Sequence, residues 1–81
     1  MAGKKVVSLV EMALGEGGFV VGFAGGHGVA RRLEAMGVRV GRPIIKKSQG
    51  FLRGPLTIQI GGTQIGLGHG MAHKVLVEVE R

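Results

Sequence analysis

Residues 56–67 read LTIQIGGTQIGL, in which apolar and polar side chains alternate on both sides of the pair Gly61-Gly62. Successive side chains of a strand point to opposite faces, so this alternation predicts two strands that each bury one face. A two-residue glycine loop between such strands is typical of a β-hairpin with a type I′ turn, because both glycines can adopt positive φ. The stretch therefore predicts an antiparallel sheet.

Three further segments have the pattern of short strands. Valines alternate with glutamates over residues 75–80, and an apolar run follows the glycines at 17–18. Residues 42–47 form the third segment, with Pro43 near its start, where a strand tolerates proline. Curling such short strands into a small barrel would remove their exposed edges. We therefore predict a mostly β fold, a small five-stranded barrel with strands at 19–23, 42–47, 56–60, 63–67 and 75–80.

One segment has the pattern of an α-helix. Val29, Leu33 and Met36 recur at helical spacing, and charged side chains occupy most of the opposite face. Gly37 stands where a glycine in the left-handed conformation would end the helix. We therefore predict one short α-helix after the first strand.

The N-terminal segment carries no recognisable targeting signal. Residues 1–5 are polar, and the apolar stretch 6–10 is far too short for a signal peptide. Ser8 and Glu11 instead have capping-box spacing, which predicts a helical turn or two before Gly15. No run approaches the roughly 20 apolar residues that cross a bilayer. We therefore expect a cytoplasmic protein that is not membrane-embedded.

The composition indicates a single small domain over residues 1–81. The chain has no cysteine, which excludes disulfides and thiolate metal sites. Its 17 glycines are about three times the average share of a protein, which fits a fold with many tight turns. A small domain without such cross-links lies close to its stability limit, so a bound partner or a homo-oligomer would add to its stability.

The charge is positive and concentrated in the middle of the chain. Lysine and arginine number 11 against 5 glutamates, a formal net charge of +6. Seven of the 11 basic residues lie between Arg31 and Arg53, with Glu34 as the one carboxylate among them. This pattern suits an anionic partner such as nucleic acid, a membrane surface or an acidic protein face. Solvated ends of the strands and helix explain it equally well.

The residues that enzymes need are scarce and scattered. The chain has no Asp, Cys, Tyr or Trp, and neither Ser8 nor Ser48 has a spacing to histidine that indicates a catalytic base. The glycines around His27 resemble a dinucleotide-binding fingerprint, but Arg31 occupies the place of its third glycine. We therefore predict that the protein is not an enzyme and binds no dinucleotide.

Two histidines are the candidate metal ligands. His69 and His73 lie four residues apart, which on a helix would place both imidazoles on one face. A transition metal such as Fe²⁺ or Zn²⁺ would need a third ligand from a glutamate or a second chain. Two surface histidines in a connecting segment are the alternative interpretation.

Nucleic-acid binding is the third interpretation of the basic charge. Small barrels that bind single strands present aromatic side chains on which bases stack. The chain has three phenylalanines as its only aromatic residues, and Phe19 and Phe23 lie in an apolar strand where we expect them to face the core. We therefore expect no nucleic-acid partner.

An ordered set of short motifs between Ser8 and Glu80 resembles the ferrous-iron transport protein A (FeoA) family. The motifs are the helix end RLEAMG at 32–37, GPL at 54–56 and the pattern A-x-x-V-x-V-E at 72–78. No single motif is specific, but their order is. The resemblance covers residues 8–80 of the chain.

The resemblance implies an SH3-like β-barrel with a helix packed against it. Proteins of this family are small and cytosolic, and they support FeoB, the membrane-embedded GTP-dependent ferrous-iron transporter. A similar domain forms the C-terminal part of iron- and manganese-dependent repressors. The resemblance therefore implies an accessory protein that binds the cytosolic part of FeoB, and so reaches the inner face of the membrane through its partner, with a metal-sensing domain as the alternative.

The predicted partner-binding surface combines apolar anchors with basic neighbours. Phe51 and Leu52 lie in the loop 48–55 and belong to no periodic pattern, so we expect them to be exposed. Interfaces commonly place a few apolar anchors inside a polar rim. The predicted anchors are Met36, Phe51 and Leu52, and the predicted rim is Arg31, Arg32, Lys46, Lys47 and Arg53.

Overall fold

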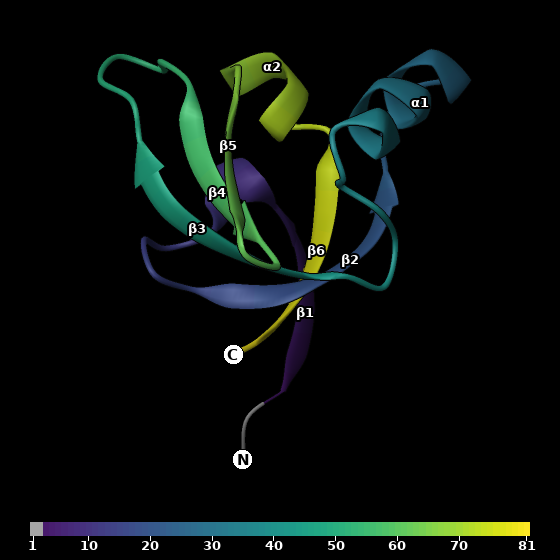
Figure 1. The fold of residues 1–81 in the computed structure, drawn as a ribbon. Coiled ribbons are helices and arrows are strands. Elements are labelled where there is room, and N and C mark those ends of the chain that lie inside the picture. Colours follow the sequence, from purple (N-terminus) through teal and green to yellow (C-terminus); the bar gives the residue numbers. More distant parts are fainter. Residues whose placement is uncertain (1–2) are drawn as a thin grey trace.

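Six antiparallel strands form one strongly curled sheet in the computed structural model, which describes residues 3–81 (Figure 1). The strand order across the sheet is β1-β6-β2-β3-β4-β5. The strands are β1 (Lys4–Ser8), β2 (Gly17–Phe23), β3 (Pro43–Gln49), β4 (Leu56–Ile60), β5 (Thr63–Leu67) and β6 (Val75–Glu80). The helical elements are the 3-10 turn η1 (Leu9–Glu11) and the α-helices α1 (His27–Ala35) and α2 (His69–Ala72).

The prediction of five strands is wrong by one, because β1 was missed. β1 pairs with β6 in the register Val7↔Val77, and only its last two residues are buried. Its sequence KKVVS has no alternation that would mark it as a strand. The helix α1 consequently follows the second strand and not the first. The turn predicted after Ser8 is present as η1, and the Ser8 amide donates to Glu11 Oε1 at 2.9 Å.

β2 changes partner along its length, and this curls the sheet. Residues Gly17–Phe19 pair with β3, whereas Phe19–Phe23 pair with β6, with an irregularity in register between Val20 and Gly22. β1 and β5 end the strand order of the described sheet. The result is a barrel-like sheet with two edge strands. The short helical elements α2 and η1 contact one another.

The predicted hairpin of β4 and β5 is confirmed, in the register Ile58↔Ile65. Leu56, Ile58 and Ile60 all point into the core, as their alternation predicted. The turn type was predicted wrongly: Gly61 alone of the two glycines has positive φ, at 60°, which is the sign pattern of a type II′ turn.

Phe19 does not face the core, contrary to the prediction. Val20 takes the inward position and is 1% exposed, so strand alternation turns the Phe19 ring outward, where it is 55% exposed. Phe23 is partly buried and packs against the core. The outer face of β2 is therefore more apolar than the sequence suggested.

The end of α1 matches its prediction. Gly37 has φ of 97°, its amide donates to Glu34 O at 3.0 Å, and the Val38 amide donates to Leu33 O at 2.9 Å. This pair of bonds is a Schellman motif, and the side chains of Leu33 and Val38 are fully buried. No helix within residues 3–81 has the length and apolar character needed to cross a bilayer.

Candidate partner-binding surface

The loop between β3 and β4 closes on itself through two backbone hydrogen bonds. The Gly50 amide donates to Pro55 O at 2.8 Å, and the Gly54 amide donates to Phe51 O at 3.0 Å. Leu52 and Arg53 between them have φ of 52° and 60°. Two positive φ values at the centre of a turn are the pattern of type I′, which usually holds glycine or asparagine. We call residues 50–55 the tip loop.

The tip loop stores strain and exposes apolar surface. The left-handed conformation costs a side-chain-bearing residue about 1–2 kcal/mol, and Leu52 and Arg53 both adopt it. Phe51 is 87% exposed and Leu52 is 84% exposed. Backbone strain at an exposed site supports a hypothesis of function, because core packing does not account for it. The tip loop is thus a closed turn that presents two apolar side chains to solvent.

A shallow depression beside the tip loop gathers cationic side chains. Arg53 lines it together with Lys74 and the two candidate ligands His69 and His73. Lys74 was not singled out in the sequence, because it belongs to no charged run. The remaining lining residues are Val10, Gln49 and Gly70. The depression combines an arginine and a lysine with two imidazoles, which suits a carboxylate or another anion.

The two candidate metal ligands, His69 and His73, both line this depression. No group of three potential metal-ligating side chains occurs in the part of the chain that the structure describes. Glu11 is near His73, but its carboxylate already accepts the Ser8 amide, which is the main reason that its pKa is lowered. Arg53 and Lys74 add positive charge to the site. A divalent cation would meet repulsion from these two side chains, and its further ligands would have to come from a second chain.

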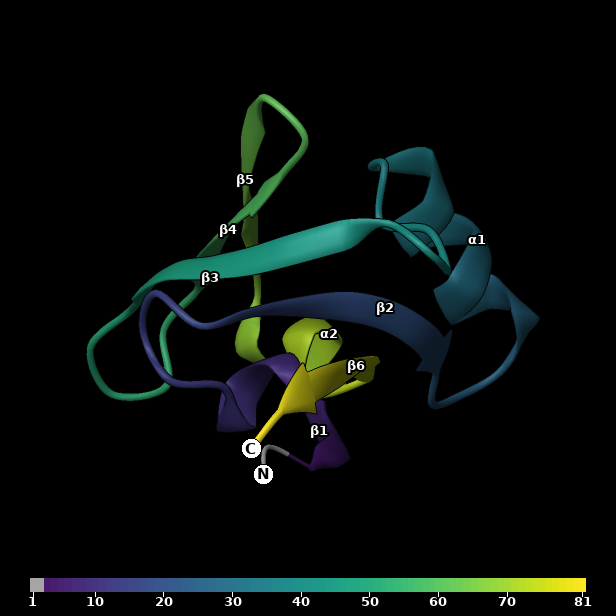
Figure 2. The ribbon, with the colours of Figure 1, turned by 90° about the horizontal axis from the view of Figure 1, so that it is seen from below.

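The α1 part of the predicted surface lies apart from the tip loop. In Figures 1 and 2, α2 lies between α1 and the loop that joins β3 to β4. Arg31 and Arg32 are exposed on α1, and Met36 at its end is 42% exposed beside the β4–β5 turn. Lys47 is exposed on β3. The structure therefore separates the tip-loop residues Phe51, Leu52 and Arg53 from the α1 residues Arg31, Arg32 and Met36.

Lys46 does not belong to any surface, and its predicted place in the basic rim is wrong. Its side chain is 1% exposed, and Nζ donates to Val10 O at 2.9 Å and to Met12 O at 2.8 Å. Its backbone bonds the same loop, with Gly15 N donating to Lys46 O at 2.7 Å. Burial lowers the pKa of Lys46, and the Glu16 carboxylate partly offsets this. Lys46 therefore fastens the segment before β2 to β3.

The fold and the exposed surface define a small SH3-like domain, and the sequence places it in a family. The FeoA domain model matches residues 7–79, so the chain belongs to the FeoA family. The SH3-like assignment agrees with a solved FeoA that is described as a prokaryotic SH3 domain protein. A comparison with curated protein sequences gave no significant match.

Two solved FeoA structures are similar over most of their length. An iron uptake regulatory protein (FeoA) is 37% identical with a TM-score of 0.81, and the match covers 90% of this chain and 95% of that one. The FeoA of Stenotrophomonas maltophilia, solved with zinc, is 28% identical with a TM-score of 0.71 and 88% coverage of both chains. Both comparisons support the family assignment.

The same fold occurs within a larger regulator. A manganese-dependent transcriptional repressor is 16% identical with a TM-score of 0.84, and the match covers 98% of this chain but 44% of the repressor. At this level of identity the likeness concerns the fold alone. A part of one metal-dependent repressor thus has the same fold, as the resemblance implied for such repressors.

Proposed function

We propose that this protein is an accessory factor of ferrous-iron uptake that binds the cytosolic part of a FeoB-type GTP-dependent transporter. It acts by contact and catalyses no reaction. Family membership supports the role in ferrous-iron uptake, because one solved FeoA is described as an iron uptake regulatory protein and another as a candidate ferrous-iron transport activating factor. The observation that carries the proposed mode of action is the strained tip loop with its exposed Phe51 and Leu52.

The tip loop and the depression beside it supply complementary parts of a binding site. Phe51 and Leu52 would enter an apolar hollow on the transporter, and their burial drives association. Arg53 and Lys74 would pair with acidic groups at the edge of that hollow and fix its orientation. Because the loop is closed by its own hydrogen bonds, little conformational entropy is lost on binding. Binding would bring the protein to the inner face of the membrane.

Replacing Leu52 with asparagine should lower the affinity for the partner without lowering the stability of the protein. Asn tolerates the left-handed conformation, so we expect L52N to keep or raise the free energy of unfolding, by up to about 1 kcal/mol. The same change removes an apolar anchor, and we expect affinity for the transporter's cytosolic domain to fall at least about tenfold, as for a hot-spot side chain. Urea denaturation and isothermal titration calorimetry measure the two effects.

V40N serves as the control, since Val40 is also exposed but lies outside the tip loop. It should leave the affinity for the transporter unchanged. Equal affinity of L52N and the unmodified protein would remove the tip loop from the interface.

Charge reversal distinguishes the two basic clusters. We expect R53E to weaken binding by about tenfold or more at low salt and to flatten its salt dependence, because Arg53 lies in the cationic depression beside the tip loop. R31E changes the charge by the same amount on α1. We expect it to lower the affinity by about twofold or less, because only long-range attraction is reduced. A larger loss for R31E would move the interface to α1.

A further inference from the structure

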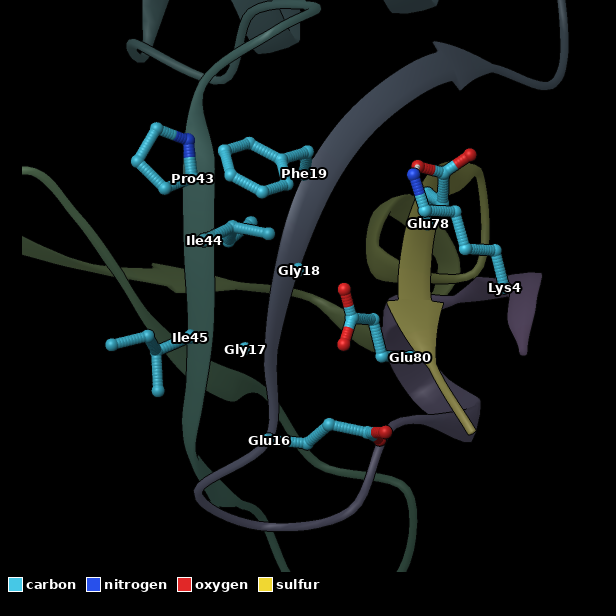
Figure 3. A pocket seen from close by; sticks show the side chains of 10 residues that line it. All are labelled: Lys4, Glu16, Gly17, Gly18, Phe19, Pro43, Ile44, Ile45, Glu78 and Glu80. Carbon is cyan, nitrogen blue, oxygen red and sulfur yellow. Dashed lines mark ion pairs between the residues drawn. The ribbon is translucent and has the colours of Figure 1, made fainter. Parts of the chain in front are cut away.

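A groove on the outer face of the sheet lies where β2 leaves β6 to pair with β3. Cross-strand pairing places Phe19 beside Pro43 and Gly17 beside Ile45 on β3. On the other side, Phe19 is opposite Glu78 of β6. Figure 3 shows Phe19 and the β3 side chains along one wall and the β6 glutamates along the other, with the bare backbone of the glycines between them.

The hollow exists because Gly17, which faces outward on β2, carries no side chain. Gly18 faces inward, where a Cβ would clash with Glu78 O and with the valine side chains of β6. Gly17 faces the groove, and a Cβ there would make contacts of 3.5 Å with Ile44 and Ile45, which are ordinary van der Waals distances. Packing thus requires glycine at 18 but not at 17. The resulting groove has a volume of about 420 Å³.

The groove carries most of the negative charge of a basic protein. Glu16, Glu78 and Glu80 line it, which is three of the five carboxylates in the chain. Glu16 is paired with Arg81 at 3.1 Å, and Glu78 lies 4.0 Å from Lys4. Glu80 has no ion pair within the described residues 3–81 and is exposed at the end of β6. Lys4 also lines the groove and is opposite Glu80 in the β1–β6 pairing, but its ion pair is with Glu78. An incoming cation would therefore find in Glu80 a carboxylate that has no ion pair among the described residues and that faces the apolar wall.

We propose that this groove binds an extended segment of a partner protein that carries a lysine or arginine next to an apolar side chain. The apolar side chain would lie over Gly17 against Phe19 and Ile45. The long cationic side chain would lay its stem along the same wall and place its charged end at Glu80, as such side chains commonly do. Phe19 supplies an aromatic face that also favours a cation.

The groove and the tip loop lie on different parts of the molecule. In Figure 1 the loop between β3 and β4 is at the top, whereas β1, which begins at Lys4, and the end of β6, at Glu80, are at the bottom. The tip loop is cationic and the groove is acidic, so the two sites suit different partner segments. One molecule would therefore hold two segments at once, which goes beyond the function proposed above.

Titration of the ¹⁵N-labelled protein with two capped pentapeptides tests the groove. The probe Ac-Ala-Arg-Ile-Arg-Ala-NH₂ should shift the amide signals of residues 16–19 and 78–80, and Ac-Ala-Glu-Ile-Glu-Ala-NH₂ should not. We expect E80Q to weaken the first peptide at least about fivefold, as for a lost charge-assisted contact. G17V should abolish its binding by filling the groove, since the backbone leaves room for Cβ. E34Q removes the same charge on α1 and should leave the affinity for the first peptide unchanged.

Three results would overturn the proposal. Equal shifts with the acidic peptide would show that charge plays no part. Unchanged affinity in E80Q would contradict it even if G17V failed to fold. Concentration-dependent shifts of the same amides without peptide, lost in E80Q, would assign the groove to a second copy of this chain. None of these results depends on the transporter, so the proposed function stands or falls separately.

Discussion

Replacing Gly18 with alanine should lower the free energy of unfolding by about 3 kcal/mol, the upper range for overpacking a well-packed interior. The new Cβ would overlap Glu78 O and lie 2.7 Å from Val77 Cγ1 and 2.9 Å from Val79 Cγ1. A backbone carbonyl in a paired strand cannot move aside cheaply, so β2 and β6 would have to separate locally. Urea denaturation followed by circular dichroism measures the change.

Gly17→Ala is the matched control for Gly18→Ala. It makes the same chemical change one residue earlier in the same strand, where the nearest atoms to a Cβ are at 3.5 Å. We expect it to change the free energy of unfolding by less than about 1 kcal/mol, as is usual for a substitution that fits its site. If both variants were equally stable, the close approach of β2 to β6 would be wrong.

Replacing Lys46 with methionine should destabilise the protein by about 2 kcal/mol, because one buried and one partly buried carbonyl would lose their donor. Val10 O and Met12 O both accept from Nζ, and Met preserves the apolar stem without the charge. K47M is the control, since Lys47 is the exposed neighbour on the same strand. Hydrogen exchange of the amides in residues 9–16 should speed up in K46M and not in K47M.

The loss of stability in K46M, relative to the unmodified protein, should also grow with pH. Burial lowers the pKa of Lys46 below its ordinary 10.5, so in the range below 10.5 the unfolded chain binds more protons than the folded one. The folded state of the unmodified protein therefore gains stability relative to the unfolded state as pH rises through this range. K46M lacks this gain, and all other titrating groups are common to both proteins. The difference in free energy of unfolding should be larger at pH 10 than at pH 7, and a constant difference would contradict the burial of the charge.

Local patterns in the sequence were sufficient for the hairpin and for the end of α1. The alternation around Gly61 and the position of Gly37 act within a few residues, and the structure contains both features. β1 was not predictable in the same way, because it is held by pairing with β6 and two of its three exposed residues are lysines. A strand that is defined by its partner leaves little periodicity in its own sequence.

The candidate site was also predictable only where local sequence decides the position of a side chain. Phe51 and Leu52 belong to no periodic pattern, and both are exposed. The segment IIKK of β3 carries no alternation, so nothing local shows that Lys46 points inward and Ile45 outward. The inward direction of Lys46 depends on the carbonyls of Val10 and Met12, which lie more than 30 residues earlier in the chain. The depression at α2 likewise joins Gln49 and Arg53 to residues of a distant helix.

The left-handed conformations of Leu52 and Arg53 have a consequence for engineering. Glycine or asparagine at either position would relieve strain, so a selection for heat resistance alone would enrich these substitutions. Such variants would be more stable. If the tip loop is the partner-binding site, as proposed above, they would also support iron uptake less well, and a screen for thermostability would discard the side chains that contact the partner.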